Sequence, residues 1–131
     1  MEVYKGSCLC QEVRYQIDGP IIRLNFCHCI MCQKAHGAAF APYMRVLKDN
    51  FRVLEGQALI QSFASSEGIT RTFCGNCGSN LQWIRESSDA MGVAAGTLDS
   101  DIDIQPSVQI WCDEAKTWHQ LRDDVPQYAT E

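Results

Sequence analysis

Three of the chain's eight cysteines fall within six residues of one segment, 26-FCHCIMCQKAHG-37. Cys27 and Cys29 are two residues apart, so on an extended backbone both thiols point to the same side. Cys29 and Cys32 are three apart, and this spacing brings side chains together on a helical turn. One ion can therefore collect all three thiols, and thiolate sulfur suits zinc, whose protein sites are tetrahedral and rich in cysteine. Three ligands leave the fourth position unassigned, and we expect the rest of the chain to hold this cluster.

Four of the other five cysteines form two more short-spaced pairs, Cys8-x-Cys10 and Cys74-x-x-Cys77. In a secreted chain eight cysteines would suggest four disulfides. The N-terminal segment lacks a basic stretch followed by an apolar run, so the pairs favour metal binding over disulfides. Cys112 lies between apolar residues and is interpreted as a small buried hydrophobe rather than a ligand.

The length of 131 residues predicts a single domain over residues 1–131, with no linker, repeat or low-complexity run. No stretch approaches the length needed to span a bilayer, so we expect a soluble, cytoplasmic protein with no membrane partner. The formal net charge is −5, and the 11 Lys and Arg residues are scattered along the sequence. Because binding to phosphate backbones requires a concentrated positive charge, nucleic acid is an unexpected partner.

The hydrophobic pattern predicts a mainly β fold with one short helix. Val13, Tyr15 and Ile17 alternate with polar residues, as a half-buried strand requires. Pro42 predicts an edge or a bulge in its strand, and no segment keeps a helical period over ten or more residues. The expected helix covers residues 29–36, and the expected strands cover residues 12–18, 21–26, 39–46, 51–54, 59–64, 69–73, 80–85, 91–95 and 108–112.

The cysteines can be divided between metal ions in two ways. In the first, Cys29 and Cys32 join Cys74 and Cys77 as a zinc ribbon, but the 41 residues between the pairs exceed the usual spacing and Cys27 is left over. In the second, one group is a closed site of four cysteines and the other an open site of three. Structural zinc sites are closed and catalytic sites keep an open position. The second division therefore gives one ion to folding and one to chemistry; its closed site is Cys8, Cys10, Cys74 and Cys77, and its open site is Cys27, Cys29 and Cys32.

These cysteine groups and their neighbours resemble the glutathione-dependent formaldehyde-activating enzyme family, which includes centromere protein V. The resemblance implies a β-tent fold of small antiparallel sheets that is stabilised by zinc. It also implies two Zn²⁺ ions, one structural on the four-cysteine site and one catalytic on Cys27, Cys29 and Cys32. The family often has a histidine where this chain has Gln109, so any role of that histidine is lost or altered. The neighbouring motifs are 6-GS-7, 33-QK-34, 78-GS-79, 96-GTLD-99, Trp118 and 125-VPQY-128.

An ion with three thiolates is a weak Lewis acid but can take a further thiol and hold it as a nucleophilic thiolate. Thiol addition to an aldehyde fits this chemistry. The resemblance supplies glutathione and formaldehyde as partners, joined as S-hydroxymethylglutathione in a carbon–sulfur lyase reaction. The alternative functions are a non-catalytic zinc-stabilised binding domain and a thiol-responsive zinc site. The sequence leaves open whether the protein forms a homodimer.

The sequence offers several further candidates around the open site. His28 or His36 is an alternative fourth ligand that would make the site structural, and His36 is the better placed of the two. Lys34 and Arg71 are candidates to hold glutathione carboxylates. His119 is expected on the surface, and both Trp83 and Trp111 are expected in the core.

Overall fold

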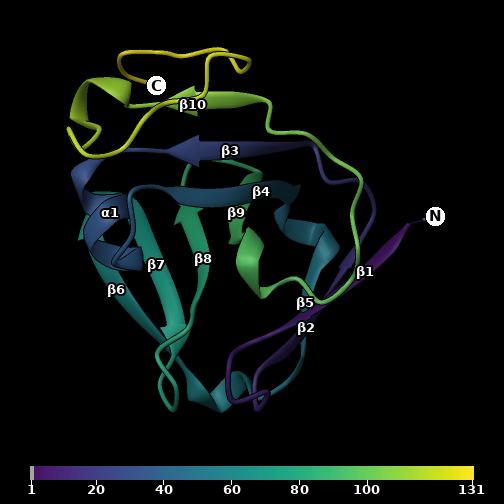
Figure 1. Cartoon of the computed structure of the whole chain (residues 1–131). Helices are drawn as coiled ribbons and strands as arrows, with labels where there is room; N and C mark the ends of the chain where they lie inside the picture. Colours follow the sequence, from purple (N-terminus) through teal and green to yellow (C-terminus); the bar gives the residue numbers. More distant parts are fainter. Residues whose placement is uncertain (1) are drawn as a thin grey trace.

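The computed structural model describes residues 2–131, which form two β-sheets and one short α-helix (Figure 1). The smaller sheet is antiparallel with the strand order β1-β2-β5. Its strands are β1 (Val3–Ser7), β2 (Arg14–Asp18) and β5 (Phe51–Glu55). The alternation of Tyr15 and Ile17 with polar residues is explained here, because both side chains are fully buried on one face of β2.

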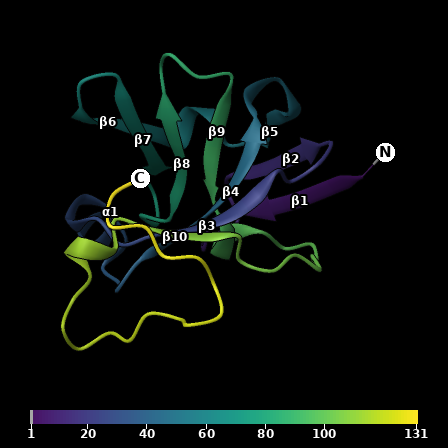
Figure 2. The same ribbon diagram turned by 90° about the horizontal axis from the view of Figure 1, so that it is seen from above.

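The larger sheet has the strand order β10-β3-β4-β9-β8-β7-β6. Neighbouring strands are antiparallel, as the resemblance implies, except β10 and β3 at one edge, which are parallel. The strands are β3 (Arg23–Cys27), β4 (Ala41–Leu47), β6 (Ile60–Ser66), β7 (Ile69–Cys74), β8 (Asn80–Arg85), β9 (Ala90–Ala94) and β10 (Val108–Ile110). The C-terminal segment runs beside β10 (Figures 1 and 2), where the Gln109 N–H donates to the Pro126 carbonyl and the Tyr128 N–H to the Gln109 carbonyl.

Helix α1 (Ile30–His36) begins directly after β3, as the sequence predicts. Cys29 is its N-cap and accepts a hydrogen bond from the Cys32 N–H through its sulfur, while Gly37 ends the helix in the left-handed conformation with φ 60°. The other helical segments are single 3₁₀ turns: η1 (Lys48–Asn50), η2 (Gln57–Leu59), η3 (Ala95–Thr97) and η4 (Cys112–Glu114). The prediction of a mainly β protein with one short helix is confirmed.

Besides shifts of one or two residues at strand ends, three features of the strands differ from the sequence predictions. Strand β1 was not expected, because it contains Gly6 and is specified by pairing with β2 rather than by its own pattern. The last strand stops at Ile110 because Trp111 has a positive φ of 55°. Strand β4 is central in the sheet, yet Pro42 pairs only with Phe26 of β3, since the pairing with β9 starts one residue later at Tyr43.

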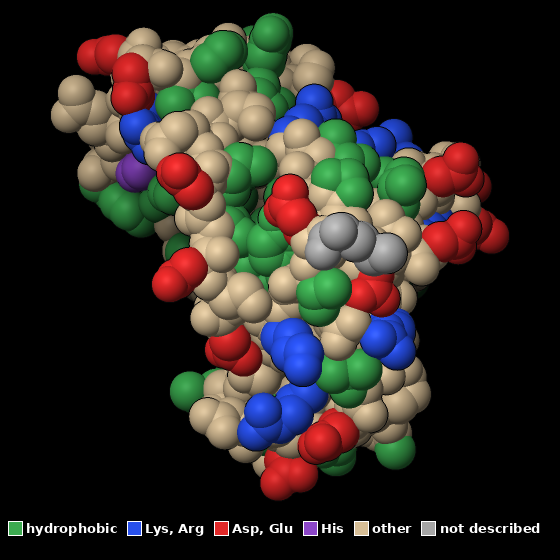
Figure 3. Space-filling view, turned by 90° about the vertical axis from the view of Figure 1, so that its right-hand side faces the viewer, with side chains coloured by type: hydrophobic (Ala, Val, Ile, Leu, Met, Phe, Trp, Pro, Cys, Tyr) green, Lys and Arg blue, Asp and Glu red, His purple; other side chains and the backbone are tan. Residues whose placement is uncertain are grey.

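The main core lies where the two sheets meet. Tyr15 and Ile17 of β2 pack there against the buried side chains of Met44, Val46, Met91 and Val93 from the large sheet. The Tyr15 hydroxyl is 2.7 Å from Thr97 Oγ1, which ties the small sheet to the turn η3. On the face in Figure 3, Lys and Arg side chains lie among Asp and Glu side chains. Among residues 2–131, no helix is both long enough and apolar enough to cross a membrane.

Candidate active site

The structure gathers the cysteines into two groups, one of four and one of three. Within each group all sulfur atoms lie within 4.8 Å of one another. The division into a group of four and a group of three matches the second division above, and Cys29 and Cys32 do not join Cys74 and Cys77 in the described residues. The first group is Cys8, Cys10, Cys74 and Cys77, and the second is Cys27, Cys29 and Cys32.

The four-cysteine group joins the turn after β1 to the turn between β7 and β8. Its sulfur separations include 3.5 Å for Cys8 and Cys10 and 3.9 Å for Cys10 and Cys74. A tetrahedral zinc with Zn–S bonds of about 2.3 Å has sulfur–sulfur edges of about 3.8 Å, so these separations fit that ion. Ser79 Oγ lies 3.3 Å from Cys77 Sγ and helps to lower the pKa of that thiol to about 5, whereas burial raises the pKa of Cys8 to about 11.

The three-cysteine group forms at the junction of β3 and α1. Cys27 is the last residue of β3, Cys29 caps the helix, and Cys32 lies in its first turn. The neighbouring Cys27 and Cys32 side chains lower the pKa of Cys29 to about 2, and the Cys32 N–H donates to the Cys29 sulfur at 3.3 Å. The pKa of Cys27 is raised by the neighbouring Cys29 and Cys32 side chains and by burial. This thiolate character suits a cationic metal.

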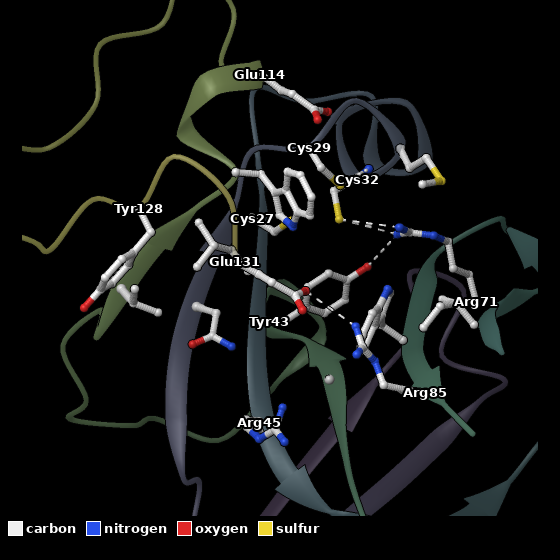
Figure 4. A pocket seen from close by; sticks show the side chains of 18 of the residues that line it. Cys27, Cys29, Cys32, Tyr43, Arg45, Arg71, Arg85, Glu114, Tyr128 and Glu131 are labelled. Atoms are coloured by element: carbon white, nitrogen blue, oxygen red, sulfur yellow. Dashed lines mark hydrogen bonds and ion pairs between the residues drawn. The ribbon is translucent and has the colours of Figure 1, made fainter. Parts of the chain in front are cut away.

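Arg71 of β7 is the charged side chain that contacts this group most closely (Figure 4). Its Nη1 and Nη2 atoms both lie 3.6 Å from Cys32 Sγ, and Nη1 also donates to the Tyr43 hydroxyl at 3.2 Å. Burial of the guanidinium opposes its charge, but the negative charge of Cys32 and the contact with its sulfur outweigh burial and raise the pKa of Arg71 above its ordinary value. Arg71 therefore places a fixed positive charge beside the thiolates.

The three-cysteine group opens onto a cavity of about 1100 Å³, whereas none of the four other clustered cysteines lines it. One face of the large sheet forms the floor of this cavity. Tyr43 of β4 packs closely over Gly92 of β9, where an added Cβ would lie 3.1 Å from the tyrosine ring. The two cysteine groups therefore differ in their access to this cavity, because the group of three lines it and the group of four does not.

Neither histidine candidate completes the three-cysteine group. The Nε2 atom of His36 lies 2.9 Å from the Tyr43 hydroxyl. His28 is fully buried, and its ring stacks on His119 at 5.3 Å between ring centres. His119 is therefore half-buried against His28 rather than a simple surface residue, which corrects the prediction. No histidine, aspartate or glutamate of residues 2–131 joins the three sulfurs at metal-ligand distance.

The other residues singled out in the sequence differ in whether they line the cavity. Trp83 and Trp111 are half-buried and line the cavity, so the prediction that they are core residues is wrong in part. Lys34 is exposed and does not line the cavity. Cys112 is half-buried outside both groups. Gln109 is buried, accepts from the Arg122 N–H and donates to the Arg122 and Val125 carbonyls, so it anchors the C-terminal segment.

Sequence reasoning missed several residues of the cavity. Arg23, Arg45, Arg85 and Tyr43 line it, although none was singled out. The alternation Arg23-x-Asn25-x-Cys27 on one strand was an available signal, because alternate residues of a strand share a face. The signal is weak alone, since the sequence does not show what that face meets.

A family model for the glutathione-dependent formaldehyde-activating enzyme matches residues 3–114. The chain belongs to this family. A protein of Schizosaccharomyces pombe (strain 972 / ATCC 24843), named an uncharacterized lyase, is 31% identical over 83 residues. That match covers 62% of this chain, and it spans 57% of the length of the curated relative.

This chain also shares its fold with a protein of known structure. The crystal structure of a Rhodobacter sphaeroides protein superposes with a TM-score of 0.64 and covers 75% of this chain and 90% of the other. The sequence identity is 22%, so this likeness concerns the fold alone.

Proposed function

We propose that this protein is a zinc-dependent lyase-type enzyme that acts on a thiol–aldehyde adduct such as S-hydroxymethylglutathione. Membership of the family supports glutathione and formaldehyde as the partners. The name of the fission-yeast relative supports a lyase. The observation that carries the proposal is the access of the three-cysteine group, whose sulfurs line a cavity of about 1100 Å³.

Two zinc ions would have different roles in this proposal. The group of Cys8, Cys10, Cys74 and Cys77 offers four sulfurs at tetrahedral spacing, so it would form a closed, structural site. The group of Cys27, Cys29 and Cys32 offers three sulfurs, so a fourth position would stay open toward the cavity. A zinc ion bound there would keep the substrate thiol deprotonated at neutral pH.

The reaction itself is a reversible addition. In the direction of synthesis, a bond forms between the thiol sulfur and the aldehyde carbon while the carbonyl π bond opens. The thiol proton ends on the new hydroxyl oxygen, and cleavage of the adduct reverses each change. No redox partner is needed, because the atoms and electrons of thiol and aldehyde balance those of the adduct.

Arg71 and Tyr43 would set the electrostatics of this reaction. Three thiolates and one divalent ion carry a formal charge of −1, and the guanidinium of Arg71 beside Cys32 offsets that charge. The Tyr43 hydroxyl accepts from Arg71 and meets His36, so it keeps the guanidinium oriented toward the sulfur. Both residues are buried, which strengthens this interaction relative to one in water.

Cobalt in place of zinc tests the open position. Added glutathione is expected to raise the sulfur-to-metal charge-transfer absorption as a fourth thiolate reaches the three-cysteine ion. Consumption of formaldehyde should depend on the thiol and disappear in folded Cys29→Ser protein. Cys112→Ser is the matched control, because Cys112 belongs to neither group.

Two results would separate the alternatives. A cobalt spectrum that ignores every thiol tried would show a closed site and would favour a zinc-stabilised binding domain. A spectrum that responds while no aldehyde reacts would keep the thiol-responsive site and remove the lyase assignment.

A further inference from the structure

Strand β3 carries three polar or ionisable side chains along one edge of the cavity. Arg23, Asn25 and Cys27 occupy alternate positions, so they share one face of the strand, and all three line the cavity. Arg23 and Cys27 are four residues apart, which corresponds to about 13 Å along a strand. The thiolate end of the cavity is therefore followed by an amide and then by a cation.

Arg45 of β4 lies directly opposite Arg23 in the sheet. Like charges at such cross-strand positions destabilise a sheet. The four ion pairs of residues 2–131 involve Arg14, Arg52, Arg85 and Arg122, so neither Arg23 nor Arg45 has an acidic partner within that range. Two arginines thus face each other without a carboxylate in a protein of net charge −5.

The other two arginines of the cavity are already engaged. Arg71 contacts Cys32 and Tyr43, and Arg85 pairs with Glu131 at 3.5 Å and lies 5.4 Å from the centre of the Trp83 ring. Arg45 lies at the other end of the cavity from Cys29 and Cys32 (Figure 4). The cations still available to an anionic ligand are therefore at the far end from the thiolates.

Asn25 adds a second, independent sign of a ligand. Its Oδ1 atom is buried and has no hydrogen-bond partner among the described residues. Buried polar atoms are almost always paired, so an unpaired one in a cavity wall suits a ligand that supplies the missing donor. A peptide N–H is such a donor, and Asn25 stands midway between Cys27 and Arg23.

We propose that Arg23 and Arg45 bind a carboxylate of the thiol substrate and that Asn25 pairs with a peptide amide of the same molecule. This inference rests on the proposed function and adds which thiol substrates the site prefers. In a peptide of three residues such as glutathione the thiol is on the central residue, so a terminal carboxylate lies roughly 7 Å from it along the extended chain. The long arginine side chains would cover the rest of the span of about 13 Å. The site then selects a peptide thiol of that length with an acidic end, and it discriminates against cysteine and other short thiols.

Binding of S-methylglutathione tests this selection without a thiolate bond to the metal, because its sulfur is methylated. Isothermal titration on the zinc-loaded protein is expected to show that the Arg23→Gln variant binds about tenfold more weakly than the wild type. The Arg45→Gln variant should show a loss of the same size, since each substitution removes a charge-assisted hydrogen bond. The diethyl ester of the same peptide and S-methylcysteine should bind weakly and equally to all these proteins. The control is Arg52→Gln, because Arg52 lies on the small sheet and pairs with Asp18.

Thermal unfolding supplies a second readout. The two arginines repel each other, so both substitutions should leave the melting temperature unchanged or raise it slightly. Asn25→Ala should also weaken binding of S-methylglutathione, while its effect on the diethyl ester should be of the same size because the ester keeps the peptide N–H groups.

Three results would overturn the proposal: wild-type protein that does not bind S-methylglutathione, arginine variants that bind it as the wild type does, or inorganic phosphate that binds as tightly and so reveals a general anion site. Failure of the cobalt or formaldehyde tests would remove the proposed function but not this binding result. The two proposals can therefore fail separately.

Discussion

If each cysteine group holds a zinc ion, as proposed, removal of the four-cysteine group should destabilise the protein more than removal of the three-cysteine group, and the loop lengths give the difference. The four-cysteine group joins Cys10 to Cys74 across 64 residues. The three-cysteine group joins residues that are at most five apart in the sequence. The entropy of closing a loop grows as (3/2)RT ln n, so the longer closure constrains the unfolded chain by about 2 kcal/mol more. For a chain of this size that corresponds to roughly 8 °C in melting temperature.

Two double variants make the comparison fair. Cys74→Ser with Cys77→Ser and Cys29→Ser with Cys32→Ser each remove a Cys-x-x-Cys pair containing one buried and one half-buried thiol. Neither leaves enough sulfurs to hold zinc tightly. Urea and thermal unfolding of the purified proteins, with zinc content measured on the same samples, should show the larger loss in the first variant. Equal losses, or a larger loss in the second, would refute the assignment of the long-range group as the structural site.

Three further substitutions test the fold and the cysteine groups. Cys112→Ala should leave the zinc content unchanged, because Cys112 lies outside both groups, and fewer than two ions per chain would make it a ligand. Gly6→Ala should destabilise the protein by several kcal/mol, because the added Cβ would overlap the Tyr15 ring; a native-like melting temperature would contradict this packing. Burial raises the pKa of Tyr15 from its ordinary value of 10 to about 12, so the neutral phenol is favoured in the folded state and stability is lost as the pH rises above 10. Relative to Tyr15→Phe, the wild type should lose about 2 kcal/mol of unfolding free energy between about pH 9 and pH 11.5. Parallel pH profiles of the two proteins would show that burial does not raise the pKa of Tyr15.

The sequence predicted the features that depend on neighbours in the chain. The short helix after Cys27 follows from local spacing and from Gly37, whose left-handed conformation ends it. Strand β2 follows from alternation, because a half-buried strand needs a period of two. Strand β1 could not be predicted in this way, since its partner β2 rather than its own composition stabilises it. The single domain over residues 1–131 and the cytoplasmic location stay predictions.

The grouping of the cysteines needed the tertiary structure. Spacing allowed both a zinc ribbon and a division into four and three. Only the approach of the turn after β1 to the end of β7 brings Cys10 within 3.9 Å of Cys74. Contacts across 64 residues depend on how the sheets pack, and no local period records them.

The set of residues that line the cavity also could not be predicted from the sequence. The sequence places arginine at positions 23, 45 and 71 but does not say that the register of the large sheet sets Arg23 opposite Arg45. A shift of one residue would turn each of these side chains to the other face, because successive residues of a strand alternate in direction. The sequence by itself therefore determined which residues can bind a metal and which segments form strands. Strand pairing decided which of the arginines, aromatic residues and thiols share one cavity, because register is an interaction between distant parts of the chain.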